Sequence, residues 1–159
     1  LSLPGETLER LGDFEKHSRR PDFVSRLALI LSNTNAPPVR DMWRLSNEDV
    51  ARAKAILSAA ALLMDFDLHE AAYRFPAALA EAVDAAAVIA GWTEAGKDAV
   101  LEQLQGIDVP MFPLNGNDLV EYGIAPGPAL GDELDRLERR WIASGFKLDR
   151  ESLLAEVKL

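Results

Sequence analysis

Two carboxylates separated by one residue, in the stretch Asp65-Phe66-Asp67, are the first residues whose spacing could support chemistry. A D-x-D pattern can hold two magnesium ions for nucleotide transfer, because two metals stabilise both the attacking and the leaving oxygen. That chemistry also needs a rigid strand and a glycine-serine turn for the triphosphate, and neither accompanies this pattern. We therefore predict that the stretch ends one helix and that Asp67 caps the next.

A second candidate pattern, E-D-x-x-R, runs from Glu48 to Arg52 and matches a base-recognition pattern found in some polymerases. Ser46 or Asn47 supplies a strong N-cap just before it, and acidic residues in a first helical turn complement the helix dipole. Ordinary helix-start chemistry explains the pattern equally well. The chain has no Walker loop, no G-x-G-x-x-G after a strand, no G-x-S-x-G and no H-x-E or H-D metal pattern. We assign no catalytic residue.

The composition excludes several other kinds of site. The 159 residues include no cysteine, which rules out disulfides and zinc sites with thiolate ligands. His17 and His69 have no partner at ligand spacing, so we assign no metal ligand and no cofactor to this chain. The longest uncharged, mostly apolar run, residues 55–64, is about half of what a bilayer requires. No signal-peptide pattern occurs, so we expect a cytoplasmic protein; because Leu1 rather than Met comes first, we expect a piece of a longer one.

The net charge of −9 is distributed unevenly along the chain. Residues 16–54 carry eight Lys and Arg against four Asp and Glu, and residues 136–150 carry five against two. Residues 65–108 carry two basic side chains against nine acidic ones. Local fields steer a polyanion more than total charge does, so the two basic stretches are compatible with a nucleic-acid partner. Solvated helix faces of mixed sign explain the same counts, and both interpretations remain open.

Helical periodicity dominates the chain, and no segment alternates well enough to predict a strand. In the longest expected helix, Val50, Leu57 and Met64 share a face, so this helix should pack inside a bundle. The expected helices cover roughly residues 6–17, 21–31, 37–43, 47–64, 68–73, 76–90, 94–104, 116–122 and 128–143, with a last one capped by Asp149.

Proline and glycine mark a boundary near Asp108. Four of the nine prolines and six of the ten glycines fall after residue 105. This shift in composition predicts a boundary between two parts of the chain. Because helical periodicity dominates and no segment predicts a strand, we expect an all-α protein without a sheet. A helical bundle body should occupy residues 1–108, and a small helical tail should occupy residues 109–159.

The tail contains one stretch, residues 112–141, with four glycines and three prolines. Its Pro-Gly-Pro turn leads into a helix whose first backbone N–H groups lack helical partners and whose dipole favours an anion. Gly127 and Gly131 have no side chains, so a bulky anion can approach the backbone. On the residues alone, a phosphate site and a plain tight turn between helices are equally good interpretations. The basic side chains that could contact neighbouring phosphates are Arg139, Arg140 and Lys147.

The tail resembles the carboxy-terminal tail of bacterial class II CCA-adding enzymes, the tRNA nucleotidyltransferases, and most of all their alphaproteobacterial members. The resemblance runs over "FPLNGNDLVEYGIAPGPALGDELDRLERRWIASGFKLDRESLLAE". The family pattern is an F/P-rich lead, G-x-D-L, a G-I/V-x-x-G-P-x-x-G turn and a W-I-A-x-x-F close. With "SRLALIL" at residues 25–31 and "WRLSNEDVARA" at 43–53, the likeness covers about 140 residues. The matching tail residues are Phe112, Pro113, Gly116, Asp118, Leu119, Gly123, Gly127, Pro128, Gly131, Trp141, Ile142 and Phe146.

The resemblance implies a head, neck, body and tail, of which this chain matches only the body and the tail. It implies that the body follows the acceptor and T arms of tRNA and that the tail grips the elbow, mainly through phosphate and sugar. The parent enzyme would add CMP and AMP to the tRNA 3′ end from CTP and ATP with Mg²⁺, and this fragment alone would not. The residues expected to bind RNA are Gly116, Gly127, Pro128, Gly131, Arg136, Arg139, Arg140 and Lys147.

The resemblance also assigns the magnesium-binding carboxylates and the base-selecting pattern to the missing head, so Glu48, Asp65 and Asp67 gain no catalytic role from it. The expected partners are tRNA and the parent's own head and neck domains, with no membrane. Two alternatives remain open: the corresponding region of a poly(A) polymerase, and a helical protein-interaction module without an RNA role. Tight, salt-dependent binding to folded tRNA favours the enzymes, and no binding favours the module.

Overall fold

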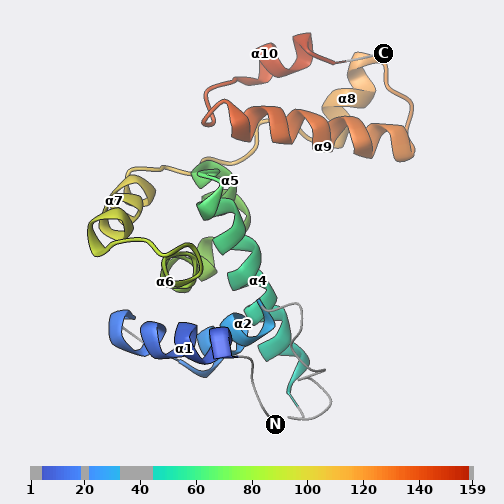
Figure 1. Ribbon diagram of the computed structural model, residues 1–159. Coiled ribbons are helices and arrows are strands. Elements are labelled where there is room, and N and C mark those ends of the chain that lie inside the picture. Colours follow the sequence, from blue (N-terminus) through green and yellow to red (C-terminus); the bar gives the residue numbers. More distant parts are fainter. Residues whose placement is uncertain (1–4, 19–21, 33–44, 158–159) are drawn as a thin grey trace. The chain divides into compact units, whose positions relative to one another are not determined.

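The computed structural model describes residues 5–18, 22–32 and 45–157. Within those ranges every regular element is helical and no strand occurs, which confirms the predicted all-α class (Figure 1). The chain divides into two compact units, Leu1–Ile107 and Asp108–Leu159, one residue from the predicted boundary. No described helix is both long enough and apolar enough to cross a membrane.

The first unit, called the body below, contains α1, α2 and α4 to α7 among the described residues. Two of its helices start at the N-caps that the sequence predicts. Ser46 Oγ accepts from Asp49 N at 3.0 Å, and Thr93 Oγ1 accepts from Gly96 N at 3.1 Å. The bounds are α1 Gly5–His17, α2 Phe23–Leu31, α4 Asn47–Met64, α5 Leu68–Arg74, the 3-10 turn η1 Pro76–Ala78, α6 Leu79–Ala90 and α7 Glu94–Gln105.

Three predicted helix positions differ from the structure or fall outside it. The predicted start at Pro21 and the predicted helix over residues 37–43 lie outside the described residues. α2 begins after Asp22, whose carboxylate accepts a backbone hydrogen bond as the N-cap. Pro76 opens the tight turn η1 rather than α6 itself, which begins at Leu79.

The core of the body lies between α4 and α6, with α1 and α2 packed alongside. α4 packs inside the bundle as predicted, but Val50, Leu57 and Met64 are only partly buried, and Leu57 and Met64 pack against the edge of the core. Alanine fills the contact instead, because small side chains let two helices approach closely. The buried residues are Ala53, Ile56, Ala59, Ala60 and Leu63 of α4 and Ala82, Val83, Ala85 and Ala86 of α6.

Arg52, at the end of the E-D-x-x-R pattern, ties three parts of the body together. Its Nη2 donates to Asp22 Oδ2 at 3.1 Å and to Glu81 Oε1 at 2.7 Å, and so joins α4 to the cap of α2 and to α6. The hydrogen bond to Glu81 raises the pKa of Arg52 above its ordinary value. A guanidinium held by two carboxylates is a structural tie, which supports the helix-start interpretation of the pattern.

The stretch Asp65-Phe66-Asp67 reverses the chain at the end of α4. Phe66 N donates to Leu63 O at 3.2 Å and Asp67 N donates to Leu62 O at 2.9 Å, the two bonds of a Schellman motif. Phe66 has a left-handed φ of 62° at the position that glycine usually occupies, which costs an L-residue about 1–2 kcal/mol. Asp67 is the N-cap residue of α5, as predicted, but its side chain makes no capping hydrogen bond.

The second unit, called the tail below, consists of α8 Gly116–Tyr122, α9 Pro128–Ala143 and α10 Arg150–Ala155. Trp141 is 2% exposed, and its ring lies 5.3 Å from that of Phe112 and 4.7 Å from that of Phe146, between centroids. The W-I-A-x-x-F close and the F/P-rich lead of the sequence therefore meet in one aromatic cluster. The buried aliphatic side chains of the tail are Leu114, Leu119, Leu137, Ile142 and Leu153.

Candidate nucleic-acid interface

Asp118 connects the start of α8 to α10. Its Oδ2 accepts from Asn115 N at 2.7 Å, and the Asn115 side chain accepts from the first turn in return, which completes a capping box. Its Oδ1 accepts from Arg150 Nη2 at 2.7 Å. The Arg150 guanidinium, and then the Asn115 amide, hold the pKa of Asp118 below its ordinary value. Asp118, the aspartate of the G-x-D-L pattern, therefore has a structural role in the tail, where it caps α8 and connects it to α10.

Two glycines shape the way α8 meets α9. A Cβ placed on Gly116 would lie 3.4 Å from Leu130 Cδ2, so this position packs directly against α9. Gly123 ends α8 with a φ of 115°, a conformation that L side chains rarely adopt. Gly116, expected to contact RNA, therefore also has a packing role.

The helix that follows the Pro-Gly-Pro turn, α9, starts without a side-chain cap. Gly127 is its N-cap residue, with a φ of 153°, and Pro128 is its first residue. The first turn contains no acidic side chain, and Leu130 N donates to Gly127 O at 3.1 Å. A Cβ placed on Gly127 or Gly131 would meet no other atom within 4 Å. The start of α9 is therefore accessible to a bulky group.

A groove of about 520 Å³ borders this helix start. Its charged lining consists of two carboxylates, Asp132 and Glu133, and one guanidinium, Arg136. The two carboxylates would repel a phosphate inside the groove. An anion would therefore be held at the backbone end of α9 rather than deep in the groove.

The guanidinium of Arg136 is engaged within the tail. Nε and Nη2 each donate to the Glu133 carboxylate at 2.8 Å, and Nη2 also donates to Glu156 O at 2.7 Å. The hydrogen bond to Glu133 raises the pKa of Arg136 above its ordinary value. Because Glu156 follows α10 directly, Arg136 ties α9 to α10. A contact from Arg136 to RNA would have to compete with these three bonds.

The other predicted basic residues differ in how they are paired. Arg140 Nε lies 3.2 Å from Glu156 Oε2, although 51% of the Arg140 side chain is exposed. Arg139 Nε donates to the backbone carbonyl of Asp135, one turn earlier, at 3.1 Å. Within the described residues neither Arg139 nor Lys147 has an ion pair, and both side chains are exposed. These two are the members of the predicted set best able to reach a phosphate.

The acceptors that bond to the basic side chains of the tail were not identified from the sequence. Glu156 accepts from Arg136 and Arg140, which precede it by 20 and 16 residues, beyond any helical spacing. Arg150, which the sequence did not single out, is bonded to Asp118 across 32 residues. Only the Arg136–Glu133 pair had a local signal, since side chains three residues apart on a helix are neighbours.

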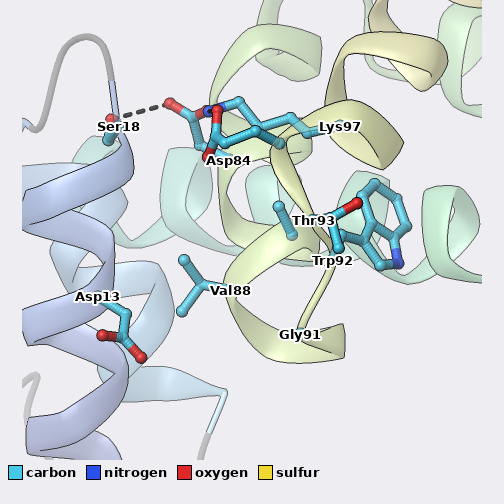
Figure 2. A pocket seen from close by; sticks show the side chains of 10 residues that line it. Asp13, Ser18, Asp84, Val88, Gly91, Trp92, Thr93 and Lys97 are labelled. Atoms are coloured by element: carbon cyan, nitrogen blue, oxygen red, sulfur yellow. Dashed lines mark hydrogen bonds and ion pairs between the residues drawn. The ribbon is translucent and has the colours of Figure 1, made fainter.

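The body contains a pocket of about 300 Å³ with several charged side chains in its lining, which comes from α1, α6, α7 and the segments next to them (Figure 2). Ser18 Oγ donates to Asp84 Oδ2 at 2.8 Å, and Lys97 Nζ lies 3.0 Å from Asp84 Oδ1. The Lys97 side chain is buried, so its ammonium serves this network rather than solvent. With Asp13 and Glu94 also in the lining, the pocket is unsuited to a phosphate. The part of the chain that the structure describes holds no group of three His, Asp or Glu able to bind a metal.

Comparison with known proteins gives partial matches. No family model matches the chain. The chain is 33% identical over 63 residues to CCA tRNA nucleotidyltransferase 1, mitochondrial, of Mus musculus, a match that covers 40% of this chain. The proteins of the same name from Homo sapiens and Danio rerio are 32% and 30% identical over 63 and 60 residues, which cover 40% and 38% of this chain. In each case the chain spans 14% of the relative's own length.

These matches support a relation to the tRNA nucleotidyltransferases. They are shorter than the likeness of about 140 residues on which the sequence interpretation rests. All three relatives are named as mitochondrial proteins, from a mouse, a human and a fish. The alphaproteobacterial grouping therefore stays a prediction.

Proposed function

We propose that this chain is the RNA-holding body and tail region of a tRNA nucleotidyltransferase. The observation that carries the proposal is the similarity over 60 to 63 residues to three relatives named CCA tRNA nucleotidyltransferases. In this role the chain positions the acceptor arm, the T arm and the elbow of tRNA. A head elsewhere in the parent polypeptide adds CMP and AMP to the 3′ end, using CTP, ATP and Mg²⁺.

The geometry of the tail supports this role. α9 begins with an accessible, uncapped N-terminus, where backbone N–H groups and the helix dipole favour a phosphate. Arg139 and Lys147 add exposed cations that no described carboxylate pairs with. Such groups respond to charge and shape rather than to base sequence. That suits a substrate class in which many sequences share one shape.

The proposal extends to the surroundings of the chain. Its partners are tRNA and the head and neck of the same polypeptide, and its proposed location is the cytoplasm. We expect no nucleotide transfer by the chain itself, because the sequence places no paired carboxylates beside a triphosphate cradle. A poly(A) polymerase would share the architecture, and the products that the parent polypeptide makes from CTP and ATP distinguish the two.

The first test is binding of the purified chain to several folded tRNAs at increasing salt. The logarithm of the association constant should fall linearly with the logarithm of salt concentration, by about 0.7–0.9 per phosphate contacted. Similar affinities for different tRNAs support the proposal. No binding at low salt overturns it and favours a helical protein-interaction module.

The second test is Ala129→Glu, which places a carboxylate in the first turn of α9. The new charge complements the helix dipole and should stabilise the tail by a few tenths to about 1 kcal/mol. If a phosphate docks there, tRNA affinity should drop although the melting temperature holds or rises. Ala51→Glu is the matched control, since it adds the same charge at an exposed position of α4. Equal affinities of the two variants with intact folding would make the turn plain architecture.

A further inference from the structure

The body contains a stacked aromatic pair that the proposed function does not use, the exposed Phe66 and the partly buried Trp92. The two rings are stacked, with centroids 6.5 Å apart and 25° between their planes. Phe66 follows the end of α4 and Trp92 follows the end of α6, so two helix ends bring the rings together. Phe66 is nevertheless 68% exposed, which leaves most of its ring available to another molecule.

The backbone at Phe66 is unusual for an exposed aromatic residue. Glycine occupies the left-handed positions at the ends of α6 and α8, Gly91 with a φ of 68° and Gly123 with a φ of 115°. α4 has Phe66 there instead, with a φ of 62°. A bulky residue in this conformation is strained, and such strain is concentrated at functional sites. Because Phe66 is mostly exposed, little burial offsets the strain.

Two aspartates neighbour Phe66 in the sequence. Asp65 and Asp67 are both exposed, and neither makes an ion pair or a side-chain hydrogen bond with another described residue. Elsewhere in the chain such carboxylates are used: Asp22 and Asp149 both cap helices through their side chains. The turn therefore presents two exposed carboxylates without described partners, one immediately before and one immediately after Phe66 in the sequence.

The next basic side chains along the chain have partners of their own. Arg74 lies 2.9 Å from Glu70, and Lys97 lies 3.0 Å from Asp84. An aromatic face attracts a cation, and a planar guanidinium can stack on the ring while its N–H groups bond to carboxylates beside it. The same carboxylates repel phosphate. Charge therefore favours a cationic protein segment over RNA at this surface.

We propose that Asp65, Phe66, Asp67 and Trp92 form a docking surface for an arginine-bearing segment of a partner protein. The guanidinium stacks on the exposed face of Phe66 and donates hydrogen bonds to the flanking carboxylates. Arginine fits better than lysine, because the compact ammonium of lysine cannot both stack and form a planar fork of hydrogen bonds. The surface lies within the body and is independent of the proposed phosphate contacts of the tail.

The test titrates the 159-residue chain with a tetra-arginine amide peptide, and with tetra-lysine amide for comparison, while NMR shifts are followed. Shifts should concentrate at residues 65–67 and at the Trp92 indole, with severalfold tighter binding of the arginine peptide. Phe66→Gly should weaken that binding at least about fivefold while the melting temperature rises by about 2–4 °C, because the left-handed strain is relieved. Lost binding in a variant of raised stability is not a folding defect.

A matched pair of variants separates this surface from the general attraction of a chain with net charge −9. The double variant Asp65→Asn with Asp67→Asn should weaken binding of the arginine peptide as much as Phe66→Gly does. Asp132→Asn with Asp135→Asn removes the same charge from exposed positions of α9 and should leave binding within about twofold. Equal losses in the two double variants, equal binding of both peptides, or unchanged binding to Phe66→Gly would overturn the proposal. Tighter binding of hexauridylate at Phe66 and Trp92 would also overturn it and assign the surface to RNA.

Discussion

The body and the tail are both helical, but they differ in how far their basic side chains are paired: among the described residues, Lys54 of the body has no ion pair, and in the tail Arg139 and Lys147 have none. In the body, Arg52 and Lys97 are bonded to carboxylates, while Asp65 stands exposed without a partner among the described residues. In the tail, Arg136 forms an ion pair with Glu133 and so has a structural role, whereas Arg139 is exposed and has no ion pair among the described residues. The difference teaches that the net charge of −9 says little about partners, because the unpaired charges select them locally.

The largest effect that would test this comparison is on the stability of the tail. Trp141→Ala removes the centre of its aromatic cluster and should destabilise the tail by about 3–5 kcal/mol. Amide signals of the tail and the body, followed by NMR during urea unfolding, measure the two units separately. Val109→Ala, at a partly exposed position of the tail, is the control. Loss of the body signals together with those of the tail would show that the two units do not fold as separate cores.

The next effect concerns the paired cations of the body. Lys97→Met leaves the Asp84 carboxylate with Ser18 and partial solvent, and should destabilise the body by about 2 kcal/mol, less than for a fully buried pair. The midpoint of urea unfolding measures it. Arg26→Met breaks an exposed pair with Glu15 and should change the midpoint far less. Equal effects of the two variants would contradict a special role for the buried network.

The unpaired cations of the tail should matter for binding rather than for stability. Arg139→Ala with Lys147→Ala should leave the melting temperature unchanged and lower the salt slope of tRNA binding by about 0.7–0.9 per lost contact. Lys16→Ala with Arg26→Ala removes the same charge from cations that have carboxylate partners. If both double variants lose equal affinity for every tRNA, pairing does not decide which cations bind, and the comparison fails.

The smallest effect is a response of the tail to acid. The pKa of Asp118 is lowered, first by Arg150 and then by the Asn115 amide, so its contribution to stability is complete above its unfolded pKa of about 3.9. That contribution is lost as pH falls through the lower folded pKa. Asp118→Asn should therefore flatten the decline in the tail's melting temperature below about pH 4. The exposed Asp135→Asn variant should follow the parent curve; a parallel decline of Asp118→Asn would contradict the assignment.

Local signals predict what local interactions decide. The caps at Ser46 and Thr93 and the end of α8 at Gly123 involve residues a few positions apart, and the structure confirms all three. The packing of α4 inside the bundle was predicted but its most buried face was not, because periodicity gives weight to Leu57 while the close contact depends on small residues such as Ala60. Helix packing depends on how well the surfaces of two helices fit together, and the sequence of one helix alone does not reveal that fit.

The candidate site was predicted as one set, and the structure divides it by role. Gly116 packs against α9 and Arg136 is bonded to Glu133 and Glu156, while Arg139 and Lys147 remain exposed. The sequence could not separate these roles, because the partner of a basic residue is chosen by the folded chain. Whether the exposed pair contacts RNA stays a prediction.

The unequal lengths of the tail helices have a consequence for folding kinetics. α8 and α10 contain 7 and 6 residues, well below the roughly 12–15 that an isolated helix needs, whereas α9 contains 16. α9 is therefore the tail helix of the described residues best able to persist in the transition state, with the two short helices condensing onto it afterwards. Substitutions that weaken α9 should then slow refolding. Those that release α10, such as at Arg150, should mainly speed unfolding.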